Sequence, residues 1–100
     1  HPIYTAPAQQ GWLTDGNGQK SWPVNGYQRE GRRVSNWLAE GVIKQHRTLG
    51  SYINPLAQQG FIIQHLNEWG PSAQQIAATP ALDEEQERPM IFILAARKPA

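Results

Sequence analysis

The stretch Met90-Ile91-Phe92-Ile93-Leu94-Ala95-Ala96, between Pro89 and Arg97-Lys98-Pro99, decides the fold of this chain. A short apolar run that is rich in β-branched and aromatic residues and bounded by prolines predicts a β-strand rather than a helix. A half-exposed strand alternates apolar and polar residues, whereas a run without any polar position is typical of a strand covered on both faces. The rest of the sequence holds too little amphipathic helix to cover a sheet twice. Together with a start at His1-Pro2-Ile3 without a methionine, this leads us to expect the C-terminal piece of a larger α/β protein.

The composition indicates a folded protein of one small domain. Of its 100 residues, 39% are hydrophobic and 17% are charged, values that separate it from disordered chains. A formal net charge of +1 argues against a dedicated nucleic-acid-binding protein. The absence of cysteine excludes disulfides and thiolate metal sites, and no segment approaches the ~20 apolar residues of a membrane span. We therefore expect a cytoplasmic protein without a nucleic-acid or membrane partner.

Composition divides the chain into three parts, of which the first two are poor in regular structure. Residues 1–9 form a short segment that we expect to be extended, because prolines punctuate it. Residues 10–47, the Trp-rich segment, hold three of the four tryptophans and dense turn signals. Within this segment, residues 32–38 and 42–47 predict a β-hairpin joined through Ala39-Glu40-Gly41, where Gly41 can supply the positive φ of a short loop.

The third part, residues 48–100, opens with a predicted helix. Its apolar side chains recur at the spacing of one helical face: Leu49, Tyr52, Ile53 and Leu56. Thr48 or Ser51 can cap the start of this helix, and Gly60 stands where a left-handed residue would end it. Because Pro55 would cost a hydrogen bond in a helix that begins at Thr48, we expect the regular helix to begin at Ser51.

The remaining elements lead to the final strand. Residues 61–66 predict a strand, and residues 72–79 predict a short helix capped by Ser72. The acidic run 83–88 is typical of a solvated linker into the strand at residues 90–96.

The sequence carries no metal or nucleophile signature. The three histidines lie far apart in the sequence: His1, His46 and His65. This spacing fits no metal site, and the chain has neither a glycine-rich phosphate loop nor a Gly-x-Ser-x-Gly elbow.

The aromatic residues of the Trp-rich segment allow two interpretations. The residues concerned are Trp12, Trp22, Tyr27 and Trp37. They can form the small core of a region that has few aliphatic side chains, or an aromatic wall over a ligand cleft that holds a planar or cationic group.

The triplet His46-Arg47-Thr48 lies where the predicted hairpin ends and the predicted helix begins. Such junctions at the end of a sheet often carry the binding groups of α/β proteins. In the alternative interpretation His46 and Arg47 are solvated residues at a strand end, and Thr48 is a helix cap.

The order of these elements and their residues resembles a known family. The quoted motifs are His1-Pro2-Ile3-Tyr4-Thr5-Ala6, Trp22-Pro23-Val24 with Tyr27 and Glu30-Gly31, Gly41-Val42-Ile43-Lys44, His46-Arg47-Thr48-Leu49, Tyr52-Ile53-Asn54-Pro55-Leu56, Gly60-Phe61, and Arg88-Pro89-Met90 through Lys98-Pro99. Over essentially its whole length the chain resembles the C-terminal half of a class I S-adenosylmethionine-dependent methyltransferase of the small-molecule type.

The resemblance implies a fold and a division of the chain. The fold is the C-terminal part of a Rossmann-like α/β methyltransferase sheet, with the last strand antiparallel between its neighbours. Residues 1–9 then follow the fifth strand, residues 10–47 form an inserted lid with a β-hairpin, and residues 48–100 supply the last helix and the final two strands.

The resemblance also implies what the site binds. The cofactor of the whole protein is S-adenosylmethionine, held by a glycine-rich loop and an acidic residue that do not occur in this chain, so the chain alone is expected to be inactive. A small-molecule acceptor lies under the lid, where we expect His1, Tyr4, Trp22, Tyr27, Trp37, His46 and Arg47 to line the cleft. Either His1 or His46 could serve as a general base if the acceptor loses a proton.

Two other classes of function fit the residues. The chain could be a free-standing module whose tryptophans stack on a planar ligand, or an oligomerisation domain. The exposed edge of the strand at residues 90–96 further predicts a homodimer, because unpaired apolar strand edges recruit another chain.

Overall fold

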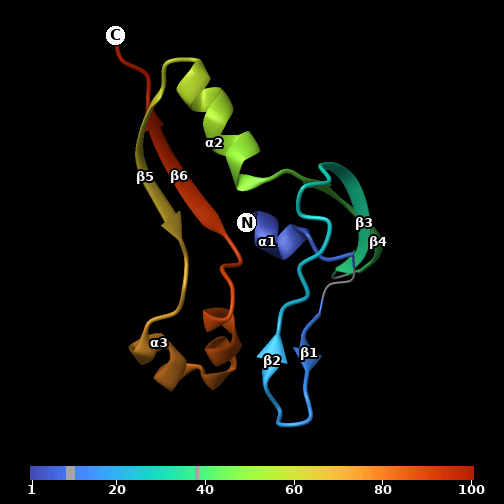
Figure 1. Ribbon diagram of the computed structural model, residues 1–100. Coiled ribbons are helices and arrows are strands. Elements are labelled where there is room, and N and C mark those ends of the chain that lie inside the picture. The colour runs from blue at the N-terminus through green and yellow to red at the C-terminus, as the bar shows by residue number, and fades with distance from the viewer. Residues whose placement is uncertain (9–10, 38) are drawn as a thin grey trace.

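The structure of the protein, a computed structural model, has three separate antiparallel strand pairs within its described residues, with helices between them (Figure 1). The structure describes residues 1–8, 11–37 and 39–100, and the side chains of residues 35–40 are not included. The chain extends over 54 × 34 × 23 Å with a radius of gyration of 16.1 Å, against the ~13 Å of a compact 100-residue domain. Mixed helix and antiparallel strand content agrees with the α/β expectation at this coarse level.

The decisive C-terminal stretch forms a strand, as predicted. β6 (Phe92–Arg97) pairs antiparallel with β5 (Ile62–Glu68), and Leu66 lies opposite Leu94. A bulge at Gln64 interrupts the register between Ile63 and His65. Because the bulge adds one residue, Ile63 and Leu66 are both half-buried although they lie three positions apart.

Helix α2 (Leu49–Gln58) packs against this strand pair, and Tyr52 contacts the ring of Phe92 at 5.4 Å. The expected start at Ser51 is wrong, because Thr48 is the N-cap and its side chain accepts a hydrogen bond from the Ser51 amide at 3.2 Å. Tertiary contacts on the first turn offset the hydrogen bond that Pro55, inside the helix, cannot make.

The predicted end of α2 is confirmed at Gly60, whose φ is +87°. The Gly60 amide donates to Ala57 and the Phe61 amide to Leu56. These two bonds satisfy the last carbonyls of the helix and turn the chain into β5.

An antiparallel hairpin of β3 (Gly31–Trp37) and β4 (Ala39–His46) lies in this part of the chain, but its loop is not where we expected it. Ala39 already pairs with Trp37, so the strands continue past the predicted loop, and Leu38 lies outside the described residues. Gly41 has a φ of +71° inside β4, next to the register shift. Its positive φ therefore serves a bulge rather than the loop.

Residues 1–9 contain a helix rather than the extended segment that we expected. α1 (Pro2–Thr5) begins at the N-cap His1, whose Nδ1 accepts the Ile3 amide at 3.1 Å. Proline at the first helical position presets φ and needs no donor, which explains why this proline-containing stretch is helical.

The Trp-rich segment also contains a small strand pair, β1 (Leu13–Thr14) and β2 (Lys20–Ser21). In Figure 1 this pair extends beside the turn that carries α3 (Ala73–Ala78) and the 3-10 helix η1 (Pro80–Gln86). α3 has the predicted Ser72 cap, here part of a capping box with Gln75.

The run 83–88 is not the solvated linker that we expected. Most of it belongs to η1, and Arg88 at its end is 5% exposed. Arg88 pairs with Glu85 inside the run, and Glu84 pairs with Lys20 of the Trp-rich segment.

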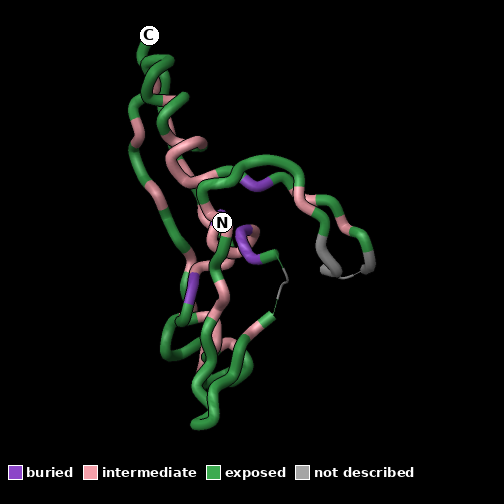
Figure 2. Tube along the Cα trace, turned by 45° about the vertical axis from the view of Figure 1, so that its right-hand side comes forward, coloured by how far each residue is buried: buried purple, intermediate pink, exposed green. Residues whose placement is uncertain are grey.

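Figure 2 shows buried segments at α1, at the end of β4 and before β6, whereas the other described parts of the chain are half-buried or exposed. Among the residues whose burial is described, Ala6 is the buried hydrophobic core residue, with the prolines 2 and 7, His46 and Arg88 buried beside it. The outer face of β6 is uncovered, and Ile93 is 63% exposed. In the described ranges, no helix is both long and apolar enough to cross a membrane.

Candidate functional site

The aromatic cluster, formed by Tyr4, Trp12 and Trp22, joins α1 to the Trp-rich segment. The rings of Tyr4 and Trp22 stack with centroids 5.3 Å apart, and Trp12 meets Trp22 edge-on at 5.2 Å. The indole nitrogen of Trp22 donates to the Ile3 carbonyl at 2.7 Å. This hydrogen bond fixes one ring of the cluster against α1, so the segment is anchored rather than loose.

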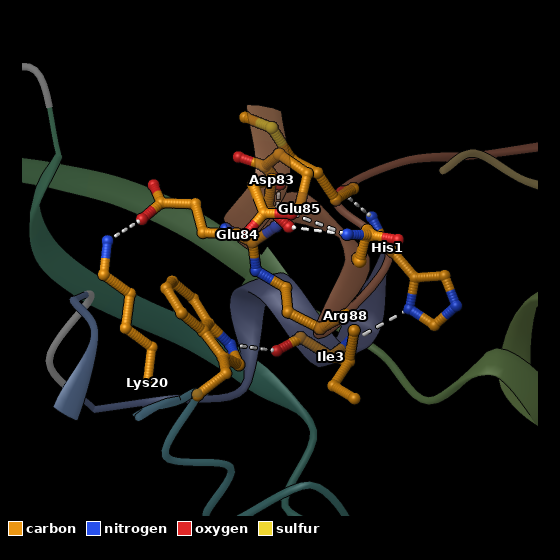
Figure 3. Close-up of polar contacts among 10 residues, drawn as sticks. His1, Ile3, Lys20, Asp83, Glu84, Glu85 and Arg88 are labelled. Atoms are coloured by element: carbon orange, nitrogen blue, oxygen red, sulfur yellow. Dashed lines mark hydrogen bonds and ion pairs between the residues drawn. The ribbon is translucent and has the colours of Figure 1, made fainter. Parts of the chain in front are cut away.

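Arg88, labelled in Figure 3, places its guanidinium over the rings of this cluster. Its guanidinium carbon lies 5.1, 4.7 and 4.4 Å from the ring centroids of Tyr4, Trp12 and Trp22, and its Nη1 pairs with Glu85. A planar, weakly hydrated guanidinium suits such a site because it stacks on aromatic faces and stays charged when buried. Arg88 therefore ties the chain before β6 to both α1 and the Trp-rich segment.

A second charged contact fastens β2 to η1. Lys20 Nζ lies 2.5 Å from Glu84 Oε2 (Figure 3). Hydrogen bonding from Lys20 is the main reason that the pKa of Glu84 lies below its ordinary value, with smaller contributions from Trp12 and Arg88. A hollow of about 470 Å³ lies beside this pair, between the β1–β2 turn and η1.

His46 is fully buried where β4 meets α1. Its Nε2 lies 2.8 Å from the Tyr27 carbonyl, and its Nδ1 lies 2.7 Å from Thr5 Oγ1. The carbonyl can only accept, so Nε2 carries a proton and donates to it. The Thr5 hydroxyl, which also lies 3.3 Å from the Pro2 carbonyl, hydrogen-bonds with Nδ1. Both ring nitrogens are thus engaged within the chain, an arrangement that orients Thr5 and Tyr27 rather than presenting a free base.

The N-terminus of α2 is held by the Trp-rich segment. The Tyr27 hydroxyl accepts the Leu49 amide at 3.0 Å, and Glu30 Oε2 accepts the Thr48 amide at 3.0 Å. The pKa of Glu30 lies below its ordinary value, chiefly because Ser51 hydrogen-bonds the carboxylate and also because of the Thr48 amide. This junction couples the base of the hairpin to the helix that covers β5 and β6.

The structure separates the predicted cleft residues into groups. Tyr4 and Trp22 belong to the aromatic cluster, and Tyr27 and His46 to the junction with α2. His1 lies elsewhere: its Nε2 is 2.6 Å from Glu68, and its ring is edge-on to Phe92 at 5.6 Å. Arg47 is exposed at the end of β4, and the Trp37 side chain falls outside the described residues.

Sequence reasoning missed Arg88 and Glu30. Arg88 belongs to an acidic run that looks solvated, and Glu30 lies in a turn. A signal for Arg88 is its place directly before Pro89, at the entry to a strand that must begin inside the protein. The tertiary partners of Glu30 have no counterpart in the local sequence.

Comparison with known proteins identifies similar chains. No protein-family model matches the sequence. An uncharacterized protein of Haemophilus influenzae is 30% identical over 104 residues, which cover 98% of this chain and 39% of that protein.

Two solved structures are similar in sequence and fold. An S-adenosylmethionine-dependent methyltransferase from Mesorhizobium loti is 48% identical with a TM-score of 0.89, covering 98% of this chain and 45% of that one. A putative S-adenosylmethionine-dependent methyltransferase from Listeria monocytogenes is 39% identical with a TM-score of 0.83, covering 100% of this chain and 45% of that one. The predicted resemblance to these methyltransferases is confirmed, and the chain spans less than half the length of each of these three proteins.

Proposed function

We propose that this chain is the substrate-capping, C-terminal portion of an S-adenosylmethionine-dependent methyltransferase that acts on a small molecule. The observation that carries the proposal is the match of the chain, at 48% identity, to 45% of the Mesorhizobium loti methyltransferase. In this proposal the Trp-rich segment covers the acceptor, and another part of the protein binds the cofactor. Methyl transfer depends mainly on aligning the acceptor with the methyl group and on excluding water, and a fixed aromatic cap serves both needs.

The packing of the Trp-rich segment supports a cap of fixed geometry. The segment is attached to α1 by the aromatic cluster, to η1 by Lys20 and Glu84, and to α2 by Tyr27 and Glu30. Attachments to three different elements would hold the segment in a fixed position over the acceptor. A loop that merely closed over a ligand would not need all three.

The described residues do not fit S-adenosylmethionine. The strand pairs in the described ranges are antiparallel, whereas nucleotide-like cofactors bind where a parallel strand turns into a helix whose first amides are free. At the start of α2 the amides of Thr48, Leu49 and Ser51 already have acceptors. No catalytic step through the cofactor is therefore assigned to this chain.

Isothermal titration calorimetry with S-adenosylmethionine tests whether another part of the protein binds the cofactor. We expect no low-micromolar binding by the 100-residue chain alone. We expect binding by a chimera in which this chain replaces the matching 45% of the Mesorhizobium loti protein. Tight binding by the isolated chain, or a folded chimera without cofactor affinity, would contradict the proposal.

Substitution of Trp22 in that chimera tests the cap. We expect Trp22→Ala to reduce methyl transfer more than cofactor affinity, because the cap acts on the acceptor. Trp22→Phe, which keeps a ring but loses the hydrogen bond to Ile3, is the matched control and should retain more activity. Equal losses of cofactor affinity and turnover in Trp22→Ala would instead indicate core packing alone.

A free-standing aromatic-binding module is the weaker alternative. Such a module needs ring faces that are open to a ligand. Here the rings of Trp12 and Trp22 contact the guanidinium of Arg88. Arg88 therefore lies where a cationic ligand would have to bind.

A further inference from the structure

We propose that the hollow at the base of the β3–β4 hairpin is a subsite for an oxyanion, a carboxylate or phosphate group carried by the methyl acceptor. The link to the acceptor rests on the proposed function, whereas the anion site itself rests on the charges described below. The hollow has a volume of about 380 Å³. Its lining consists of Ala8, Asn25, Gly26, Arg29, Glu30, Arg32, Arg33 and Val34.

Two guanidinium groups in this hollow approach the same point beside Gly26. Gly26 has no side chain, and the Nη2 atoms of Arg29 and Arg33 lie 3.0 and 3.3 Å from the point where its Cβ would stand. Because both Nη2 atoms lie near this one point, the two positive charges are close and repel each other unless an anion lies between or beside them. Gly26 therefore leaves room for the two cations to converge, and Arg32 adds a third to the same lining.

The donors in the hollow outnumber its acceptors. Arg33 is fixed by donating to the main-chain carbonyls of Ala6, Gly26 and Arg29, which are neutral and leave its charge uncompensated. Asn25 Oδ1 already accepts the Ala8 amide, so its NH₂ group remains as a donor. Glu30 is the one carboxylate in the lining, and its Oε2 is turned to the Thr48 amide.

A fourth cation lies on the same face of the hairpin. Lys44 pairs with Arg33 across the strands, and its Nζ is buried without a hydrogen-bond acceptor in the described part of the chain. Like charges directly opposite each other destabilise a strand pair, and a buried ammonium without a partner costs free energy. Burial and the charge of Arg33 lower the pKa of Lys44 accordingly. Lys44 does not line the hollow, but an anion bound beside Arg33 would reduce the repulsion between these two cations.

The net charge of the Trp-rich segment agrees with this proposal. Residues 10–47 carry six basic and three acidic residues, although the chain as a whole is almost neutral. The basic excess is thus confined to the part that is proposed to cover the acceptor. Arginine is suited to this role because its planar fork matches the oxygens of carboxylate and phosphate groups.

The subsite is tested by titrating the full 100-residue chain with inorganic phosphate and, separately, with succinate. Binding is monitored by NMR at low ionic strength. We expect saturable binding of at least one probe, and the preferred probe assigns the oxyanion as phosphate or carboxylate. The double variant Arg29→Gln/Arg32→Gln should weaken binding by about tenfold or more. Arg97→Gln/Lys98→Gln removes the same charge at the other end of the chain and should change binding by less than about twofold.

Lys44→Met supplies a second readout that does not depend on the exposed arginines. It keeps the apolar stem and removes the buried charge, so we expect a higher melting temperature without anion and a smaller rise when anion is added. Absence of saturable binding for both probes, or equal weakening in the two double variants, would overturn the subsite. Because these titrations need neither cofactor nor turnover, anion binding without methyl transfer would refute only the proposed function.

Discussion

The strand pair β5–β6 with α2 and the Trp-rich segment with α1 are stabilised in opposite ways. The first region is regular and apolar, yet its outer face is open, with Ile62 44% and Ile93 63% exposed. The second region has little regular structure, yet it buries Arg88 and His46 with matched partners. Regular structure and burial are thus separated in this molecule. The apolar region leaves its outer face uncovered within the described residues. The polar region satisfies most of its buried side chains itself, with Arg88 Nε and Lys44 Nζ as the exceptions among the described residues.

The largest expected effect on stability comes from substituting Arg88, because this one buried charge holds the second region together. We expect Arg88→Ala to lower the free energy of unfolding by about 3 kcal/mol, because it leaves Glu85 unpaired and empties the aromatic cluster. Ile93→Ala should cost less than about 0.5 kcal/mol, since that side chain is mostly in water. Urea denaturation measures both values.

Arg88→Lys separates charge from shape in the same experiment. Lysine keeps the charge but lacks the planar group that stacks on the rings. The loss in the free energy of unfolding for Arg88→Lys should therefore lie between the losses for Arg88→Ala and Ile93→Ala. If Arg88→Ala and Ile93→Ala cost the same, the contrast between the two regions would not hold.

A second prediction concerns the open face of the first region. An apolar strand edge and face of this kind favour association with another copy, so we expect the chain to form a homodimer in sedimentation equilibrium. Ile93→Lys should weaken the dimer by about tenfold, or about 1.4 kcal/mol. Leu13→Lys places the same charge on a residue of β1 that is 59% exposed, and we expect it to leave the dimer intact. A monomeric parent chain would contradict the prediction.

A third, smaller effect tests a feature that is local in the sequence. Ser72 caps α3, and its hydroxyl accepts the Gln75 amide at 3.1 Å while the Gln75 side chain accepts the Ser72 amide at 2.8 Å. Ser72→Ala should therefore cost about 1 kcal/mol, and Ser72→Gly only a few tenths. Thermal unfolding with far-ultraviolet circular dichroism measures the difference, and equal losses in both variants would exclude the cap as the cause.

These features show how far local sequence determines this fold. The strand at residues 90–96, the cap at Ser72 and the left-handed Gly60 were all predictable, because each depends on residues within one or two turns of chain. The hairpin was predictable too, although its loop was misplaced because Gly41 serves a bulge that depends on the register of the partner strand.

The site was less predictable because its contacts join distant residues. Arg88 meets Tyr4 and Trp22, and Glu30 meets the start of α2, across separations that no local pattern records. The start of α2 was misplaced for the same reason. Pro55 argued locally for a later start, but Tyr27 and Glu30 satisfy the amides of an earlier one.

The smallest expected effect is the response to acid of the charged contacts in the second region. The pKa values of Glu30 and Glu84 both lie below the ordinary value, chiefly through hydrogen bonds from Ser51 and Lys20 respectively. In the unfolded chain each carboxylate takes up its proton at the ordinary pKa, so protons favour the unfolded state. The stabilisation is therefore complete above the ordinary pKa of glutamate and is lost as the pH falls through the lower folded value.

Urea unfolding at about pH 7 and about pH 4 measures this loss. The double variant Glu30→Gln/Glu84→Gln should start less stable at neutral pH and decline less on acidification than the parent chain. Glu30 is exposed and the Glu84 side chain is 29% exposed, so solvent screens both contacts. The change should therefore be smaller than any of the effects above and should shrink in high salt. Glu87→Gln, which removes an exposed charge just beyond η1, is the control. If its profile flattened as much as that of the double variant, net charge rather than these two contacts would explain the pH dependence.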